Sequence, residues 1–386
     1  QVYKRIDWFP FSIRFLPLGG GVLEIRLGFL FCRRGRGDGE VFMKKRTKKL
    51  WILCLAVAAA AGIACLAGAC RERSAFSAVR EQNPEFVLTY AENQPRDYPT
   101  TQAAVRFAQM VQEETRGRIH IKIYAEGALG SETEVLKQLR FGGIDFARLS
   151  VMSLGDEIPV LNVLQLPYLY RDGDHMWKVL DGETGEVFME AFEDYDLKGL
   201  AWYDAGARHF YNSGKQVECL EDMRDLKIRV AQSGLMEDMV RALGAQPVMM
   251  DYSEVYGALE TGQIDGAENN WPSYDTMGHF EMAPYITLDA HNRIPEIQVA
   301  SGETWKKLSA EDQAIILSCA RQSALYERQL WTEREEEARK KLEAAGCQVT
   351  VLNEREQRRF EAMAKTVYKD YAKGYEELIA RIDQVQ

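Results

Sequence analysis

The stretch "DLKIRVAQSGLMEDMVRALGAQPVMMDYSEVYGALETGQIDGAENN", residues 225–270, changes repeatedly between two kinds of pattern. Its residues predict a short strand at 226–230 and helices around 234–243 and 253–261, the second helix ending at Gly262. Strands that alternate with helices in this way are typical of parallel sheets that helices cover on both faces. The stretch therefore predicts an α/β fold.

The same alternation continues on the N-terminal side of that stretch. Strands are predicted at 86–91, 119–124, 144–150 and 197–204. The helices between them are one that begins at Pro99, one that a capping box of Ser131 and Glu134 opens, and one near 174–194. Roughly 300 residues are too many for one such sheet of ordinary size, so we predict two lobes.

Residues 309–345 are strongly helical and contain neither glycine nor proline. At a rise of 1.5 Å per residue, an unbroken helix of this length would extend about 55 Å. That length exceeds the diameter of one small lobe. We therefore expect this helix either to kink or to run across both lobes.

The charge of the chain is distributed unevenly. The first 69 residues carry 12 of the 48 Lys+Arg and 4 of the 58 Asp+Glu, so that the remainder has a net charge of −18. A body this acidic argues against a nucleic-acid partner, because phosphate binding needs a basic face. It does not argue against a small anionic ligand, which needs only a local cluster of arginines.

Residues 43–69 have the layout of a lipoprotein signal peptide. A basic segment follows Met43, a run without charge extends from Leu50 to Ala69, and Cys70 comes next as the predicted lipidation site. The lipobox is imperfect, since Ala67 stands where leucine is commoner. The alternative is a retained membrane-spanning helix, since the run is about as long as a bilayer requires. The predominance of alanine and glycine favours a cleaved signal.

The signal divides the N-terminal part of the chain. No methionine precedes Met43, and we interpret residues 1–42 as probable non-native upstream translation. Residues 70–84 are polar and suit a tether to the folded part. Together these features predict an extracytoplasmic protein that a lipid anchors to the membrane, in the periplasm or at the outer face of the cytoplasmic membrane.

The search for enzyme motifs gives a negative answer. The sequence has no GxSxG, P-loop, HExxH, CxxC or glycine-rich dinucleotide turn, and we predict no cofactor. The histidines are scattered and without metal-ligand spacing, so no metal site is predicted: His120, His175, His209, His279 and His291. Asp265 and Glu268 form a possible acid/base pair, but nothing pairs them with a nucleophile. The remaining cysteines read as buried or free thiols: Cys219, Cys319 and Cys347.

Three arginines stand in or beside predicted strands. Arg148 interrupts the apolar strand "IDFARL", Arg208 lies at a strand start, and Arg229 lies in "LKIRV". A guanidinium at a strand end is suited to a carboxylate, with which it makes two parallel hydrogen bonds. Each arginine taken alone is equally suited to a salt bridge with one of the many acids. Their occurrence in successive α/β units favours an anion site, because ligands of such sheets bind outside the carboxyl ends of the strands.

With these residues in view, the chain resembles the TRAP-transporter solute-binding proteins of the DctP type, from about residue 86 to 380. The segments that carry the resemblance occur in the family's order and spacing: "LNVLQLPYLY", "LKIRV", "ALGAQPV" and "SEVYGALETGQIDGAEN". The resemblance implies a two-lobed periplasmic-binding-protein-like fold with hinge strands and a long C-terminal helix that spans both lobes. By the same likeness, lobe I is 85–205 plus 294–333, and lobe II is 206–293 plus 334–386.

The resemblance also implies a ligand site. Arg229 matches the arginine that grips the ligand carboxylate in this family, and Arg208 matches a supporting arginine. Asn269 matches an asparagine that contacts the ligand, and Tyr252 matches an aromatic residue of the pocket wall. Polar contacts of the first lobe are implied for Asn93 and Glu132.

The segments "AENNWPSY" and "HNRIPE" (291–296) are similar to family members that bind hexuronates such as glucuronate and galacturonate. The hydroxyls of such a sugar acid suit side chains that donate and accept hydrogen bonds: Asn93, Gln94, Glu132, Asn269 and Asn270. Arg148 is shared with that subgroup, either as a second charge contact or as a brace for Glu132.

The resemblance therefore implies an extracytoplasmic receptor that delivers a sugar acid to the membrane subunits of a TRAP transporter. Three alternatives stay open at this point. The ligand is another organic acid, a dicarboxylate or an oxo acid; the protein presents its ligand to a signalling receptor; or Asp265 and Glu268 make it an enzyme that acts on sugar acids.

Overall fold

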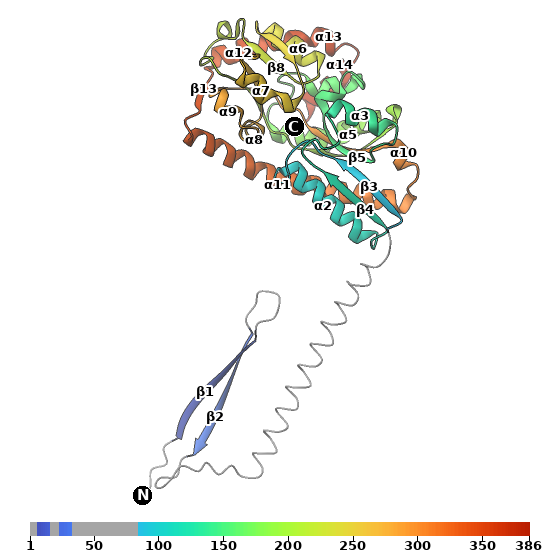
Figure 1. The fold of residues 1–386 in the computed structure, drawn as a ribbon, viewed down its shortest axis with the longest axis vertical. Helices are drawn as coiled ribbons and strands as arrows, with labels where there is room; N and C mark the ends of the chain where they lie inside the picture. The colour runs from blue at the N-terminus through green and yellow to red at the C-terminus, as the bar shows by residue number, and fades with distance from the viewer. Residues whose placement is uncertain (1–5, 16–22, 33–83) are drawn as a thin grey trace. The chain divides into compact units, whose positions relative to one another are not determined.

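The computed structural model describes residues 6–15, 23–32 and 84–386 (Figure 1). The chain divides into two compact units, residues 1–76 and 77–386. In the first unit, β1 (Ile6–Phe15) and β2 (Leu23–Cys32) pair as an antiparallel two-stranded sheet. The predicted signal peptide, Cys70 and nearly all of the predicted tether lie outside the described residues. Among the helices that are described, none has the length and apolar character needed to cross a membrane.

The second unit contains two sheets. The first has five strands in the order β4-β3-β5-β12-β6. Its strands are β3 (Phe86–Ala91), β4 (Ile119–Tyr124), β5 (Phe146–Ser150), β6 (Leu197–Tyr203) and β12 (Glu296–Ser301). β3 is parallel to β4 and β5, whereas β12 is antiparallel to both of its neighbours.

The second sheet has six strands in the order β13-β11-β7-β10-β8-β9. Its strands are β7 (Arg208–Asn212), β8 (Lys227–Val230), β9 (Gln246–Met249), β10 (Gly266–Asn269), β11 (Tyr285–Asn292) and β13 (Gln348–Val351). β8 is parallel to β9 and β10, but β7 is antiparallel to β10 and β11. Both sheets are therefore mixed, and the expectation of parallel sheets was wrong.

The antiparallel strands follow from the way the chain crosses between the sheets. It passes directly from β6 to β7, and later from β11 back to β12, without an intervening helix. Consecutive strands that are parallel within one sheet need a long crossover between them, usually a helix. β7 and β12 instead enter straight from the other sheet, and each runs antiparallel to its neighbours. Gly206 lies in the first crossing at φ 61°, where an added Cβ would meet Glu335 Oε1 at 2.5 Å. These crossings are the hinge strands that the sequence predicts.

Helices cover the two sheets (Figure 1). Those up to residue 190 are α2 (Pro99–Glu114), α3 (Glu132–Arg140), α4 (Gly173–Leu180) and α5 (Glu183–Glu190). Those up to residue 305 are α6 (Gly234–Ala242), α7 (Val255–Glu260), α8 (Trp271–Thr276), α9 (His279–Met282) and α10 (Gly302–Trp305). The predicted capping box is present, with Ser131 N donating to Glu134 Oε2 at 2.9 Å. The single helix expected near 174–194 is interrupted at residues 181–182. Gly182 is the N-cap of α5, which begins at Glu183.

Helix α11 (Ala310–Ala344) is one continuous element of 35 residues. Its first half buries Ile316, Cys319 and Ala320 in the core that packs on the five-stranded sheet. Its second half buries Ala338 and Leu342 in a core of the six-stranded sheet. The helix therefore runs along both lobes without a break, as Figure 1 shows.

The chain after α11 ends in three helices: α12 (Glu354–Ala364), α13 (Tyr368–Tyr371) and α14 (Glu376–Gln384). α14 contacts α4, since Ile382 O lies 3.0 Å from His175 Nε2. The exact limits of the two lobes stay a prediction. Cys219, Cys319 and Cys347 are free thiols, and Cys319 is buried.

Candidate functional site

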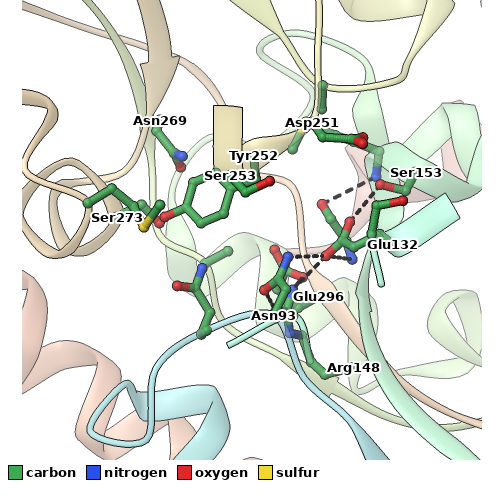
Figure 2. Close-up of a pocket in the computed structure, with 18 of the residues that line it drawn as sticks. Asn93, Glu132, Arg148, Ser153, Asp251, Tyr252, Ser253, Asn269, Ser273 and Glu296 are labelled. Carbon is green, nitrogen blue, oxygen red and sulfur yellow. Dashed lines mark hydrogen bonds and ion pairs between the residues drawn. The ribbon is translucent and has the colours of Figure 1, made fainter. Parts of the chain in front are cut away.

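A cleft of about 570 Å³ lies where strand ends of the two sheets face each other. The five-stranded side contributes residues after β3, at the start of α3, and at the ends of β5 and β12. The six-stranded side contributes residues of β7, β8, β10 and α8. All the predicted ligand-binding residues line this cleft: Asn93, Gln94, Glu132, Arg148, Arg208, Arg229, Tyr252, Asn269 and Asn270. Figure 2 labels five of them: Asn93, Glu132, Arg148, Tyr252 and Asn269.

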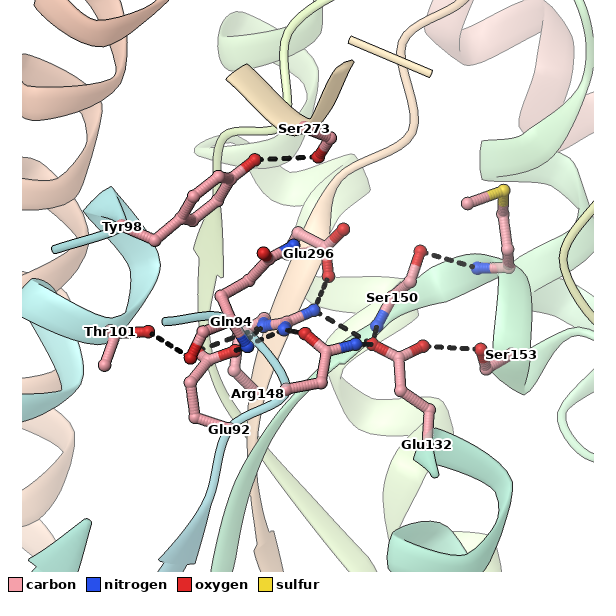
Figure 3. Close-up of polar contacts among 12 residues, drawn as sticks. Glu92, Gln94, Tyr98, Thr101, Glu132, Arg148, Ser150, Ser153, Ser273 and Glu296 are labelled. Carbon is pink, nitrogen blue, oxygen red and sulfur yellow. Dashed lines mark hydrogen bonds and ion pairs between the residues drawn. The ribbon is translucent and has the colours of Figure 1, made fainter. Parts of the chain in front are cut away.

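Arg148 holds together one wall of the cleft (Figure 3). Its Nε donates to Glu92 at 3.0 Å, and its Nη1 donates to Glu132 at 2.9 Å and to Glu296 at 2.7 Å. Its Nη2 contacts Glu92 and Asn93. Every nitrogen of the guanidinium is therefore engaged by the protein, which favours the bracing role for Arg148 over a second charge contact. A contact between Arg148 and a ligand stays a prediction.

Glu132 is fixed from several sides. Besides Arg148, it accepts hydrogen bonds from Asn93 Nδ2 at 3.0 Å, from Ser150 N at 3.3 Å and from Ser153 Oγ at 2.6 Å. Because these donors come from two separate segments, one after β3 and one at and just after the end of β5, the carboxylate cannot turn away from the cleft without losing hydrogen bonds. Sequence reasoning identified Glu132 but not the donors that position it.

Glu296 is the cleft residue that sequence reasoning missed most clearly. It is the first residue of β12, lines the cleft, and pairs with Arg148. Burial raises the pKa of its carboxyl, Arg148 opposes this and Glu132 adds to it, which brings the pKa to about 7. At neutral pH this carboxyl is therefore only partly ionised.

This raised pKa predicts how pH changes the stability of the protein. The native protein keeps the proton on Glu296 up to about pH 7, whereas the carboxyl ordinarily releases it near 4.5. The stabilisation that comes from the protonated Glu296 carboxyl is thus fully present below pH 4.5 and is lost as the pH rises through 7. The free energy of unfolding of the wild type should fall by up to about 3 kcal/mol over this range of pH, and Glu296→Gln should abolish that fall. Urea denaturation at pH 5, 6.5 and 8 measures both proteins. A variant that keeps the wild-type pH dependence would contradict the assignment.

The opposite wall contains a second ion pair, between Arg208 and Glu268. Arg208 Nη2 donates to Glu268 Oε1 at 3.0 Å and to the Glu268 carbonyl at 2.9 Å. Burial alone raises the pKa of Glu268, but the charge of Arg208 and a hydrogen bond from His291 lower it to about 2. His291 in turn also contacts Asp289, at 2.9 Å. Arg208 therefore already has a carboxylate partner inside the protein.

These contacts also account for the two residues considered as a catalytic pair. Asp265 Oδ2 accepts the backbone N–H of Lys227 at 2.8 Å, at the start of β8. Glu268 is fully buried and is held by Arg208. Both carboxylates therefore have structural partners.

Arg229 differs from the other two cleft arginines. It lies in β8 and is 4% exposed, and its Nε and Nη2 donate to the Met250 carbonyl at 3.0 and 2.8 Å. Within the part of the chain that the structure describes, no carboxylate forms an ion pair with it. Burial lowers the pKa of its guanidinium, and the nearby charge of Glu268 opposes this shift without a direct ion pair. A buried charge without a partner is costly, so this guanidinium is suited to an anion from outside.

The two adjacent asparagines have different partners. Asn270 is the N-cap of α8, where its Oδ1 accepts the Ser273 N–H at 2.8 Å. Asn269 ends β10, and its Oδ1 accepts the Asn270 N–H at 2.9 Å. The Nδ2 group of Asn269 is thereby left to donate into the cleft. The Oδ1 of Asn270 is occupied in the same way, so each asparagine offers a ligand chiefly its amide Nδ2 group.

The two walls touch each other at the side of the cleft. Tyr98 Oη and Ser273 Oγ lie 2.9 Å apart (Figure 3). The Tyr98 ring also meets the ring of Trp331 edge-on. Elsewhere, Ser233 Oγ donates to Gln165 Oε1 at 2.7 Å. Sequence reasoning missed Tyr98, Ser273 and Trp331, because only the tertiary fold brings α2, α8 and α11 together.

The residues that the structure describes include no group of three or more His, Cys, Asp or Glu side chains that would hold a metal ion. The histidines nearest the cleft serve the protein itself. His291 bonds to acidic side chains, and His279 Nδ1 lies 2.8 Å from Tyr211 Oη.

Comparisons with known proteins agree on one family. The family described as "Bacterial extracellular solute-binding protein, family 7" (DctP) matches residues 90–374. A solute-binding protein of Chromohalobacter salexigens is 35% identical over 76% of this chain and 86% of its own length.

Solved structures are similar as well. A TRAP periplasmic solute-binding protein of Pseudomonas putida F1 with bound D-glucuronate has a TM-score of 0.76 and 37% identity, covering 78% of this chain and 97% of that one. One from a Bradyrhizobium species, in complex with galacturonate, has a TM-score of 0.75 and 40% identity, covering 76% and 98%.

Proposed function

Because the chain belongs to the DctP family of extracytoplasmic solute-binding proteins of TRAP transporters, we propose that it binds a hexuronate such as glucuronate or galacturonate. We further propose that it delivers this ligand to the membrane subunits of a TRAP transporter. Members of this family bind solutes for transport, and the protein is a binding protein rather than an enzyme.

The observation that carries the proposed binding mode is the buried guanidinium of Arg229. It lines the cleft, and no carboxylate among the described residues pairs with it. A ligand carboxylate placed there would make charge-assisted hydrogen bonds and would compensate a charge that burial disfavours. Arg208 then acts as the supporting arginine from its pair with Glu268.

The rest of the cleft supports a ligand with many hydroxyls. Asn93, Gln94, Glu132 and Asn269 line it and offer both donors and acceptors. The similar proteins of known structure carry glucuronate and galacturonate, which have one carboxylate and several hydroxyls. These features together favour a sugar acid over a small apolar acid.

The proposal also includes how the protein reaches its transporter. Residues 43–69 would direct export, and a lipid on Cys70 would keep the receptor at the membrane. Both lie outside the described residues and rest on the sequence pattern alone. A mass increase on the N-terminal cysteine of protein isolated from its membrane is the observation that this part requires.

A thermal-shift screen of hexuronates, dicarboxylates and oxo acids tests the ligand class. A ligand that binds only the folded protein raises the Tm, by an amount equivalent to about 4 kcal/mol at a thousand times its Kd. We expect glucuronate or galacturonate to raise the Tm by several degrees and succinate to leave it unchanged. A shift with a dicarboxylate or an oxo acid but with neither uronate would contradict the proposal.

A further inference from the structure

We propose that Glu132 and Glu296 determine which sugar acids the cleft accepts. They accept hydroxyl donors at the end of the cleft opposite Arg229, and they exclude a ligand that places a second carboxylate there. This inference rests on the proposed function, because it assumes that the ligand's first carboxylate binds Arg229.

The wall that contains these residues has an excess of negative charge. Glu92, Glu132 and Glu296 all pair with the single guanidinium of Arg148. When all three carboxylates are ionised, three negative charges surround one cation; for Glu296 this requires a pH above its pKa of about 7. The other arginines that line the cleft lie on the six-stranded sheet, where Glu268 already holds Arg208.

The positive charge lies on the other side of the cleft. In the six-stranded sheet, Arg229 stands beside Ala267 of the parallel strand β10. Asn269 is two residues further along β10, and side chains two residues apart in a strand point to the same face. Figure 2 shows Asn269 on one side of Tyr252, and Glu132 and Glu296 on the other. The cleft is therefore polarised, with Arg229 at one end and the carboxylates at the other.

A polarised cleft of this kind discriminates between functional groups. An ionised carboxylate accepts hydrogen bonds but donates none, so it binds a ligand hydroxyl well. It cannot bind a second carboxylate, because no proton lies between the two groups and their charges repel. Arg148, Asn93 and Ser153 hold Glu132 in place, so it cannot turn aside to relieve the repulsion.

The exclusion can be measured with two linear sugar acids. Gluconate and glucarate have the same carbon chain and the same internal hydroxyls, but glucarate has a carboxylate where gluconate ends in a hydroxymethyl group. We expect wild-type full-length protein to bind glucarate at least tenfold more weakly than gluconate at pH 8, by calorimetric titration. This pH lies above the pKa of about 7 of Glu296.

Glu296→Gln should raise the affinity for glucarate at least tenfold and should change the affinity for glucuronate less than threefold. Glu132→Gln should act in the same direction and serves as a second variant if the first is poorly folded. Glu113→Gln is the matched control, because Glu113 is exposed on α2 and does not line the cleft. We expect it to leave the affinity for glucarate unchanged.

Two results would overturn the inference. One is a wild-type protein that binds glucarate as tightly as gluconate. The other is that both Gln variants raise the affinity for glucarate less than threefold, undetectable binding included. The proposed function fails separately, when the wild-type protein binds neither glucuronate nor galacturonate.

Discussion

Replacing Arg229 with methionine lowers the affinity for a hexuronate at least a hundredfold and does not lower the Tm of the ligand-free protein. Loss of one partner from a buried, hydrogen-bonded charge pair costs about 2–5 kcal/mol of binding free energy. The ligand-free protein loses nothing comparable, because among the described residues Arg229 bonds to the Met250 carbonyl and forms no ion pair with a carboxylate. Calorimetric titration and thermal unfolding of the same samples measure both effects.

Two further variants sharpen this test. Arg229→Lys keeps the charge but cannot make two parallel hydrogen bonds, so we expect an intermediate affinity. Arg224→Met removes an exposed arginine just before β8 and should bind like the wild type. The carboxylate role of Arg229 is disproved if Arg229→Met binds the uronate as tightly as Arg224→Met does.

Arg208→Met, in contrast, should reduce the free energy of unfolding by about 3–5 kcal/mol, even without ligand. Glu268 is fully buried, and this substitution removes the cation that holds its pKa at about 2. Urea denaturation at pH 7 measures the loss. The double variant Arg208→Met/Glu268→Gln should recover most of it, because it leaves no unpaired charge.

Arg241→Met provides the matched control for that experiment. Arg241 pairs with Glu237 on the exposed side of α6, and its side chain is 55% exposed. Exposed pairs of this kind contribute about 0.5 kcal/mol or less. If Arg208→Met is no more destabilising than Arg241→Met, the buried pair with Glu268 does not stabilise the protein in the way argued above.

The three cleft arginines show how far the sequence alone reaches. Their position in or beside strands predicted an anion site, and the structure does bring all of them to one cleft. The sequence left open whether each would grip a ligand or an acid of the protein. The structure gives Arg148 and Arg208 carboxylate partners, whereas Arg229 pairs with no carboxylate among the residues described. The partners Glu92, Glu268 and Glu296 come from other strands, and local patterns do not reveal which of many acids will lie nearby.

The fold shows the same division. Helix α11 and most strands follow from hydrophobic periodicity and from the absence of glycine and proline, which are local properties. The mixed sheets do not, because the direction of β7 and β12 depends on their arrival from the other sheet. For Glu296 a signal did exist, since it ends the segment "HNRIPE" that carries the likeness to uronate binders.

The crystal structure of this protein with D-glucuronate or D-galacturonate bound tests the central claim most directly. The account predicts the ligand in the cleft between the two sheets, with both carboxylate oxygens about 2.7–2.9 Å from the guanidinium nitrogens of Arg229. It also predicts ligand hydroxyls within hydrogen-bond distance of Glu132 or Glu296. A carboxylate bound to Arg148 or Arg208 in place of Arg229, or a ligand outside this cleft, would contradict it.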